Sequence, residues 1–173
     1  MQYIIRLKGG AGSGNHGHKG IPGHRGGSLP KDDQNFGNSN VSSKLEIVNG
    51  TVSEAKKLNV EWDKTYNVRT GGPFWDMNGE LNPKYYIIRD SENKLIAGAT
   101  TRQRGFGTEI VSIESKQAGE GIKLLDKLKQ NNIFLYAFSS SKNSDNWYEK
   151  FGFIRDNNHP DQYNYVWKRG NND

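Results

Sequence analysis

The feature that most constrains this chain is a strand-like run joined to an apolar helical repeat through a turn with two glycines. Residues 108–115 read TEIVSIES, and this mixture of β-branched and polar residues predicts a strand. Residues 116–128 read KQAGEGIKLLDKL, and their apolar positions recur at the spacing of one helical face. The run IFLYAFSSS at 133–141 predicts the next strand. A strand–helix–strand unit of this length predicts a parallel crossover.

The glycine turn also favours an anion. The first backbone N–H groups of a helix have no intrahelical partners and lie at the positive end of the helix dipole. Gly119 and Gly121 lack the Cβ atoms that would hold a phosphate away, and Lys116 adds a positive charge at the rim. A tight structural turn would explain the same glycines. The anion-site interpretation predicts a binding loop made of Lys116, Gln117, Ala118, Gly119, Glu120 and Gly121.

This turn matches neither of two familiar phosphate-binding loops. The chain has no G-x-x-x-x-G-K-[ST] sequence, which excludes a Walker P-loop. Leu124 stands where the dinucleotide-binding pattern G-x-G-x-x-G requires its third glycine.

The positive charge of the chain is confined to its start. The sequence has 24 Lys and Arg against 19 Asp and Glu, a net charge of +5. Five of the basic residues and none of the acidic ones lie in residues 1–31, so the remainder is neutral overall. A folded nucleic-acid-binding domain is expected to carry a basic surface of its own. The charge therefore predicts only weak nucleic-acid contact, made by the leading segment.

The leading segment is rich in glycine and histidine. Residues 9–27 hold nine glycines and three of the four histidines. Because ordering so much glycine has a high entropic cost, we expect residues 1–43 to form a flexible basic tail and linker, and residues 44–173 to form one domain. A metal could bind the histidines, but a soluble tether with incidental histidines is the interpretation we adopt, so we expect no metal. These histidines are His16, His18 and His24.

Two absences narrow the class of protein. The chain has no cysteine, which excludes disulfides, cysteine ligands for zinc and a cysteine nucleophile. No apolar run approaches the roughly 18 residues that span a bilayer, and the start lacks a cleavage signal for secretion. We therefore expect a cytoplasmic protein with no membrane partner.

From Lys44 onward, alternating and periodic apolar residues predict an α/β (mixed α+β) fold, with a mixed, largely antiparallel central sheet flanked by helices. Ser53 offers an N-cap for a first helix, in which Ala55, Leu58 and Trp62 share one face. Besides the unit at 108–141, we expect strands at 44–48, 84–90, 94–102, 151–156 and 164–169, and a short helix at 143–150.

A second motif, NWYEKFGF at 146–153, follows the strand that the helix leads into. Together, KQAGEGIKLL and WYEKFGF resemble the two best-known signatures of the GNAT superfamily of acyl-CoA-dependent N-acetyltransferases. The pattern [Q/R]-x-x-G-x-[G/A]-x-x-L-L is matched by Lys116, Gly119, Gly121, Leu124 and Leu125, and [F/L]-Y-x-x-x-G-F by Trp147, Tyr148, Gly152 and Phe153. The order and separation of the motifs also agree with the family, and the resemblance covers about residues 44–169.

The chain departs from the family pattern in the loop. Lys116 replaces the usual Gln or Arg, which keeps a donor but changes its geometry. The Val-x-Pro that often precedes the loop reads VSI at 111–113. Glu120 is an acid within the loop, where it would repel a diphosphate unless it points to solvent.

The resemblance implies a GNAT-like fold that takes acetyl-CoA as co-substrate and needs no metal. In the family, the strand before the loop diverges from the next strand, and the pantetheine arm lies in the gap. Main-chain groups around Val111 and Ile113 would then pair with pantetheine amides, and a backbone N–H there would polarise the thioester carbonyl. The diphosphate would rest on residues 116–121. Ser141 and Asn143 would contact the pantetheine or the adenine side.

The resemblance also implies a reaction, in which a primary amine attacks the thioester directly in a ternary complex. Tyr148 stands at the family position of the acid that protonates the leaving thiolate, and a phenol with a pKa of about 10 can donate at neutral pH. Tyr148 could instead be a packed aromatic residue. Glu109 and Glu114 are the candidate bases, and EIV at 109–111 favours Glu109. Because they are five residues apart, strand alternation predicts opposite faces, and either could be a solvated acid.

The acceptor is left open, as a small molecule or a protein, and would be held by residues 60–83 and 155–168. A non-catalytic interaction protein with the same fold is the alternative function. The segment GSGNHGHKGIPGHRGGS in the tail resembles glycine/histidine-rich segments of bacteriophage head-morphogenesis proteins. That resemblance implies a phage or prophage origin, with a tail that docks on phage proteins or acts as a packaging signal, and a virion-associated location as the alternative to the cytoplasm.

Overall fold

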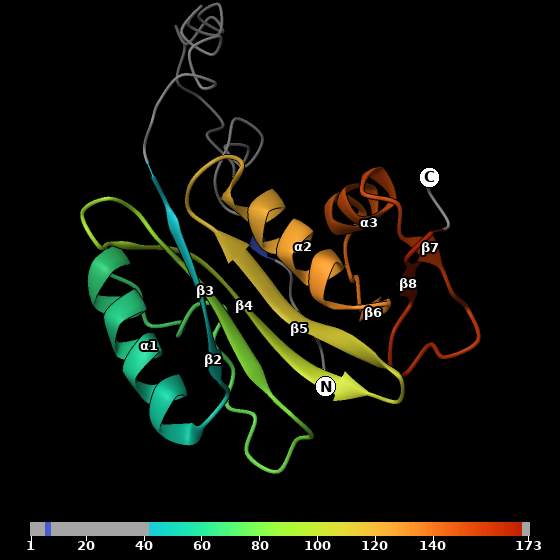
Figure 1. The fold of residues 1–173 in the computed structure, drawn as a ribbon, viewed down its shortest axis with the longest axis horizontal. Helices are drawn as coiled ribbons and strands as arrows, with labels where there is room; N and C mark the ends of the chain where they lie inside the picture. The colour runs from blue at the N-terminus through green and yellow to red at the C-terminus, as the bar shows by residue number, and fades with distance from the viewer. Residues whose placement is uncertain (1–5, 8–41, 171–173) are drawn as a thin grey trace, which may run out of the picture.

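The structure of the protein is a computed structural model that describes residues 6–7 and 42–170. It contains three helices and eight strands in these ranges (Figure 1). The strands are β1 (Arg6–Leu7), β2 (Lys44–Asn49), β3 (Lys84–Arg89), β4 (Leu95–Arg104), β5 (Gly107–Ser115), β6 (Phe134–Ala137), β7 (Ile154–Arg155) and β8 (Tyr165–Lys168). The helices are α1 (Val52–Tyr66), α2 (Glu120–Asn131) and α3 (Lys142–Lys150).

All strands belong to one sheet, in the order β2-β3-β4-β5-β6-β8-β7, with β1 paired to β5 off this path. Neighbouring strands are antiparallel except at β5–β6 and β1–β5, which are parallel. The sequence-based expectation of a mixed, largely antiparallel sheet flanked by helices is therefore confirmed. The parallel crossover predicted for residues 108–141 is also confirmed, since α2 links β5 to β6.

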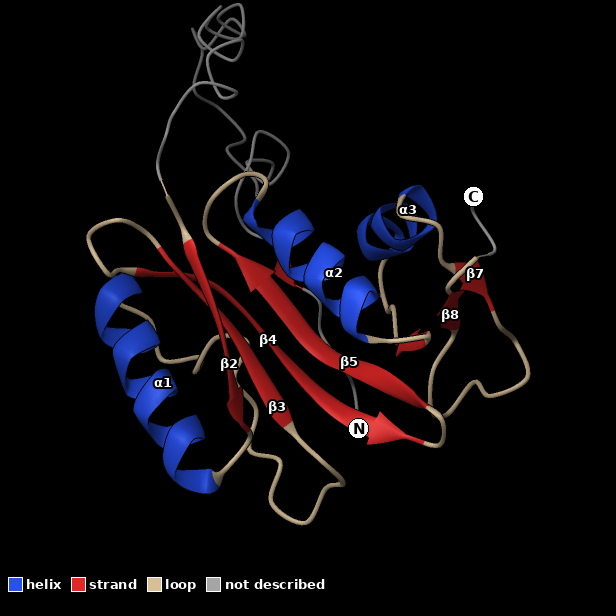
Figure 2. Ribbon diagram, in the orientation of Figure 1, coloured by secondary structure: helices blue, strands red, loops and turns tan. Residues whose placement is uncertain are grey.

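The two faces of the sheet carry separate cores. Tyr86 and Ile88 of β3 pack with Leu124 and Leu125 of α2, in a cluster that extends to α3. Their neighbours in β3 point to the opposite face, where Tyr85 and Ile87 pack with α1. This alternation follows from the two-residue period of a strand, and it gives β3 a nearly continuous apolar sequence. Figure 2 shows α2 running alongside β5, and α1 at the left of the view beside β2.

Helix α1 begins two residues earlier than expected. Thr51, not Ser53, is the N-cap, and its hydroxyl accepts a hydrogen bond from the Glu54 backbone N–H at 3.1 Å. The expected apolar face is correct, since Leu58 and Trp62 are buried against the sheet. No helix in the described ranges is long and apolar enough to cross a bilayer.

Strand β5 contains a bulge at Val111. In its ladder with β4, Ile110 pairs with Thr101 and Ser112 pairs with Thr100, so Val111 has no opposite residue. A bulge of this kind shifts the alternation of side chains by one position. The predicted opposite placement of Glu109 and Glu114 is therefore wrong. Their partners in β4 are Arg102 and Gly98, four residues apart, so both carboxylates lie on the α1 face.

The tail predicted for residues 1–43 lies outside the described residues except for Arg6–Leu7 and residues 42–43. The same holds for the three histidines considered as metal ligands. Among the described residues, no group of three His, Asp or Glu side chains is placed to hold a metal ion.

Candidate functional site

The sheet opens between β5 and β6, where the candidate site lies. These strands pair only from Thr108 with Leu135 to Ile110 with Ala137. Beyond that point β6 ends, but β5 continues to Ser115, with β4 on one side and, on the other, β1 paired only with Glu114 and Ser115. The sheet is thus split just after the bulge at Val111. The side of β5 that faces away from β4 carries backbone groups over residues 111–115 that β6 does not pair.

The turn after β5 leads from this split to α2. Gly119 has φ +82°, a left-handed conformation that strains any residue with a side chain. A Cβ added to Gly119 would meet no protein atom within 4 Å, so the turn faces open space. Gln117, Ala118 and Gly119 are exposed. No side-chain hydrogen bond caps the helix at Gly119. The Glu120 N–H donates to the Gln117 carbonyl at 3.4 Å, so the N–H groups that follow it in the first turn of α2 are the ones that a ligand could use.

Lys116 does not extend toward α2. Its Nζ lies 3.5 Å from Glu114 Oε1, and it sits over the rings of Trp62 and Tyr66 on α1, at 5.6 and 4.9 Å from the ring centroids. Cation–π contact and the carboxylate both stabilise this position. The structure therefore separates Lys116 from the other residues of the predicted loop, because it directs the ammonium group to the α1 face.

Glu120 is held by neighbours instead of pointing to solvent. The residue is buried, at 8% exposure. Its carboxylate pairs with Lys123 Nζ at 2.9 Å and accepts a hydrogen bond from Ser43 Oγ at 3.2 Å. Lys123 Nζ also donates to Ser43 Oγ at 2.7 Å. The acid in the loop is thus compensated by a basic residue one turn later in the same helix. Gly121, next to it, is also buried in the first turn of α2.

Tyr148 is buried in the core on the α2 face of the sheet. It projects from α3 into the core that α2, β6 and β8 share, and its exposure is 0%. Its ring stacks on Tyr165 at 5.7 Å and lies 4.8 Å from Phe153. Its hydroxyl has no hydrogen-bond partner among the described residues. Burial raises the pKa of this phenol well above its ordinary value, so the hydroxyl keeps its proton.

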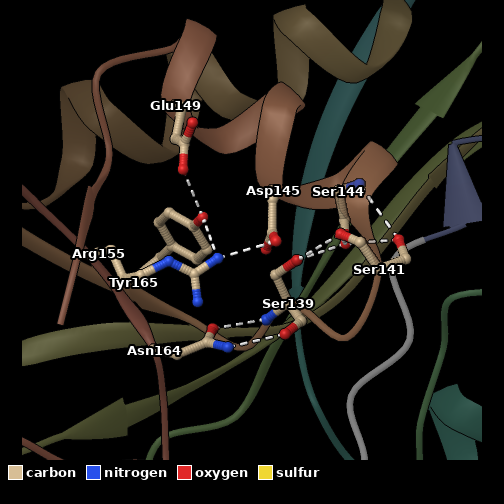
Figure 3. A network of polar contacts seen from close by, with 8 residues as sticks. All are labelled: Ser139, Ser141, Ser144, Asp145, Glu149, Arg155, Asn164 and Tyr165. Carbon is tan, nitrogen blue, oxygen red and sulfur yellow. Dashed lines mark hydrogen bonds and ion pairs between the residues drawn. The ribbon is translucent and has the colours of Figure 1, made fainter. Parts of the chain in front are cut away.

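A serine cluster fixes the start of α3 (Figure 3). Ser141 is the N-cap, and its hydroxyl accepts from the Ser144 backbone N–H at 3.2 Å. The Ser144 hydroxyl shares hydrogen bonds with the hydroxyls of Ser139 and Ser141, at 2.5 and 2.8 Å. Ser141 and Asn143 are exposed, so both remain accessible to a ligand. This cap places Tyr148 because it sets where the helix begins.

The side chain of Asn164 extends the pairing between β6 and β8 by one residue. Its side-chain oxygen accepts from the Ser139 N–H at 2.8 Å, and its side-chain nitrogen donates to the Ser139 carbonyl at 2.7 Å (Figure 3). This pair of bonds continues the β6–β8 ladder beyond Ala137 with a side chain in place of a backbone. It secures the segment after β6 to the start of β8.

A charged cluster joins α3 to β7 and β8. Arg155 donates to Asp145 at 2.8 Å and to the Tyr165 hydroxyl at 2.9 Å, and that hydroxyl donates to Glu149 at 2.7 Å (Figure 3). Tyr165 stacks on Tyr148, so this cluster also limits how the catalytic candidate can move.

A loop at residues 70–77 forms the wall of the split on the α1 face. The hydroxyls of Thr100 and Ser112 both donate to the Pro73 carbonyl, and Tyr85 donates to the Trp75 carbonyl. Gly98 allows close packing of the loop, since a Cβ there would lie 2.3 Å from Phe74. These contacts fasten the loop to β3, β4 and β5.

Between this loop and β5 lies a cavity of about 90 Å³. It is lined by loop residues from Thr70 to Trp75 and by Ser112, Ile113 and Glu114. Its volume is enough for a group of a few heavy atoms, since one water takes about 30 Å³. The cavity therefore lies directly beside the part of β5 that β6 leaves unpaired.

The two candidate bases have different surroundings. Glu109 is completely buried and accepts two bonds from Arg102, at 2.9 and 3.1 Å, and one from Arg104 at 2.6 Å. Its oxygens are thus occupied by guanidinium groups. Glu114 is also buried, at 3% exposure, but it borders the cavity and has Lys116 as a neighbour. Val111 packs with Met77 at the start of the split, and the Ile113 side chain belongs to the α2-face core.

Several residues that shape the site have only weak signals in the sequence. The i,i+3 spacing of Glu120 and Lys123 could have indicated their pairing. Nothing local marks Asn164 as a substitute for strand pairing. Pro73 and its partners Thr100 and Ser112 are distant in the sequence, so only the fold brings them together.

Solved structures of acetyltransferases resemble this chain at low identity. No family model matches the chain, and no curated protein matches it. A protein assigned as an acetyltransferase from Exiguobacterium sp. 255-15 is 14% identical, with a TM-score of 0.45 over 73% of this chain and 93% of its own. A GNAT-family acetyltransferase from Staphylococcus aureus Mu50 is 13% identical, with a TM-score of 0.46 over 71% of this chain and 96% of its own.

A third structure is the glucosamine N-acetyltransferase region of a fungal multi-domain β-N-acetylglucosaminidase. It is 10% identical, with a TM-score of 0.44 over 68% of this chain and 18% of its own. At identities and scores this low, the function has to be inferred from the residues of the site.

Proposed function

We propose that the chain is an N-acetyltransferase that moves an acetyl group from acetyl-CoA to a primary amine. The observation that carries the proposal is the open side of β5, which leaves β6 after Ile110, runs on to Ser115 and meets the exposed Gly119 turn. Such a strand offers N–H and C=O groups to an extended ligand that carries amides. Coenzyme A has an arm of this kind, followed by a diphosphate that suits the first turn of a helix.

The residues present fit coenzyme A in part. The open turn at Gly119, the uncapped start of α2 and the exposed Ser141 and Asn143 agree with this ligand. Lys116 is directed elsewhere, so the backbone of residues 117–121 would hold the diphosphate without it. Lys123 offsets the charge of Glu120, which reduces the repulsion that an acid in the loop would otherwise exert.

Acetyl-CoA, when bound, supplies an activated thioester. Tyr148 would donate its proton to the departing thiolate, because burial keeps the phenol protonated and no described residue accepts from it. The cavity at Ser112–Glu114 would hold the reacting amine next to β5. Glu114 borders that cavity, so we propose it as the group that receives the amine proton, directly or through water. Glu109 would act as a structural residue.

Calorimetric titration with acetyl-CoA and with CoA tests the cofactor. Binding of both by the full chain is expected, and no binding at high protein concentration would rule the proposal out. Labelled acetyl-CoA incubated with a lysate or metabolite mixture, followed by mass spectrometry, would identify the acceptor.

The Tyr148→Phe variant tests the chemistry. Loss of the proton donor is expected to lower turnover about 10²- to 10⁴-fold, while the affinity for CoA stays close to that of the wild type. Tyr136→Phe is the matched control, because Tyr136 is a part-buried tyrosine whose ring centroid lies 4.6 Å from that of Tyr163. Turnover that is unchanged in Tyr148→Phe would remove the acid role.

A non-catalytic protein with the same site is the second candidate. The position of Lys116 against Trp62 and Tyr66 favours it, because a basic residue of the expected loop is not available to a diphosphate. Binding of CoA without acetyl transfer to any amine in a broad panel would support this function over the first.

A further inference from the structure

The open side of β5 already has a partner from the same chain. Strand β1 pairs in parallel with the end of β5, with Arg6 opposite Glu114 and Leu7 opposite Ser115. Strand β5 therefore has β4 on one side throughout. On its other side it has β6 up to Ile110 and β1 at its last two residues. The split is thus filled, at the end nearest the Gly119 turn, by a strand from the start of the sequence.

The surroundings explain why this edge takes a strand. Ile113, Glu114 and Ser115 have exposures of 0, 3 and 4%. Backbone N–H and C=O groups that are buried need hydrogen-bond partners, and β6 does not supply them here. An extended segment that adds to a free sheet edge meets this need through its own backbone. The pairing is also non-local, because a long segment separates Leu7 from β2.

We infer that Arg6–Leu7 competes with the acyl-CoA arm for the same edge of β5, so that the chain carries an internal strand that closes its own site. This inference rests on the proposed function, because the competitor is the ligand proposed there. Strand β1 runs in the same direction as β5, so it covers the stretch between the split and the turn at residues 116–119. A ligand that reaches from the cavity at Ser112–Glu114 to the start of α2 must cross this stretch.

The closure is expected to be weak enough for a ligand to displace it. Only two residues of β1 pair with β5, and in a parallel ladder one residue of two directs its N–H and C=O toward the partner. One net backbone hydrogen bond corresponds to about a fivefold change in an equilibrium constant. The apparent affinity for CoA falls by the fraction of molecules in which the edge is free. Removing β1 from the edge is therefore expected to raise that affinity about fivefold or more.

The test uses the full chain with both residues of β1 replaced. Arg6→Pro/Leu7→Pro removes both backbone N–H groups, so the pairing is lost whichever residue faces β5. Arg6→Ala/Leu7→Ala is the matched control, because it makes the same loss of side chains and keeps both N–H groups. Two measurements are made on each: hydrogen–deuterium exchange of the backbone at residues 111–116, and calorimetric titration with CoA. The double proline variant should exchange faster there and bind CoA about fivefold more tightly, and the double alanine variant should resemble the wild type in both.

The two measurements separate the inference from the proposed function. Equal hydrogen–deuterium exchange rates at residues 111–116 in all three proteins would overturn the pairing of β1 with β5, whatever their affinities for CoA. Faster exchange in the proline variant, with CoA affinity unchanged or weaker, would overturn the competition. Faster exchange with no CoA binding by any protein would overturn the proposed function and the competition with it, while β1 remains paired. A change in exchange that appears only at high protein concentration would assign the strand to a second copy and overturn the internal closure.

Discussion

Glu109 is a buried carboxylate that stabilises the fold through its hydrogen bonds to two arginines. It has no solvent contact, and Arg102 and Arg104 donate to both of its oxygens. Arg102 also pairs with Glu80 at 2.9 Å, which ties the loop before β3 to the same cluster. Burying a charge costs several kcal/mol unless it is paired and hydrogen-bonded, and removal of one partner leaves the others uncompensated. Glu109 therefore belongs to a set of residues that must stay together.

The Glu109→Gln variant is expected to lose stability. Loss of the negative charge leaves two guanidinium groups without their shared partner, so the free energy of unfolding should fall by about 3 kcal/mol. Urea unfolding followed by circular dichroism measures this, with Glu92→Gln, an exposed residue of the β3–β4 turn, as the control. If Glu109→Gln kept wild-type stability and lost only acetyl transfer, Glu109 would be a base instead.

The sequence predicted some of these residues well and others poorly. Gly119 and Tyr148 lie inside short motifs, so their places in a turn and in a helix could be predicted locally. Lys116 also lies in a motif, but the direction of its side chain depends on Trp62 and Tyr66. These two residues belong to α1, and strands β3, β4 and β5 separate them from Lys116 in the sequence. The relation of Glu109 to Glu114 could not be predicted, because it depends on the bulge at Val111, which has no signal in the sequence of β5 alone.

The junction of β5 and α2 places two kinds of ligand-binding group next to each other. The edge of β5 offers a row of backbone groups, and the start of α2 offers unpaired N–H groups with the positive end of a dipole. The left-handed Gly119 lies between them and lets the chain change direction with open space on its outer side.

The Gly119→Ala variant tests this junction. The methyl group meets no protein atom, so the expected loss of stability is only the cost of the left-handed backbone, about 1 to 2 kcal/mol. The affinity for CoA should fall further, because the methyl group occupies the space where a diphosphate would lie. Gly79→Ala is the matched control, since its φ of +81° and its open surroundings are nearly the same. Equal effects of both variants on CoA affinity would show that the turn does not contact the ligand.

Elements were easier to predict from the sequence than their ends. Every strand expected between Lys44 and Arg169 is present, because alternating apolar residues report directly on a sheet face. The run at 133–141, however, gives a strand only at Phe134–Ala137. Beyond it, Asn164 supplies the pairing with its side chain, and a pattern of apolar residues does not distinguish this from a longer strand.

Across the protein as a whole, one partly buried and one buried tyrosine connect the elements of the α1 face. The Tyr66 hydroxyl donates to the Leu95 carbonyl, and the Tyr85 hydroxyl donates to the Trp75 carbonyl. Burial, aided by Asp90 and Glu114, raises the pKa of Tyr66 to about 12. Burial, aided by Asp76, raises the pKa of Tyr85 to about 12 as well. Both must therefore stay protonated for α1 and the loop to remain in place.

Stability is accordingly expected to fall at high pH. In the unfolded chain a tyrosine loses its proton near pH 10, but in the folded chain these two lose theirs near pH 12. Between these values the unfolded state binds fewer protons, so rising pH favours unfolding, and the stabilisation is complete below about pH 10. Urea unfolding at a series of pH values measures the slope, which should be smaller in Tyr85→Phe. Stability that is constant from about pH 9 to 12 would contradict this assignment.

The fastening of Pro73 has a consequence for how the protein would select its acceptor. Two hydroxyls from neighbouring strands converge on one carbonyl, so the surface next to the cavity is set before any amine arrives. A preorganised surface of this kind binds acceptors of complementary shape more tightly than acceptors that require the protein to change conformation. A variant that accepts a wider range of amines would have to weaken the hydrogen bonds to the Pro73 carbonyl, and its free energy of unfolding would fall as a result.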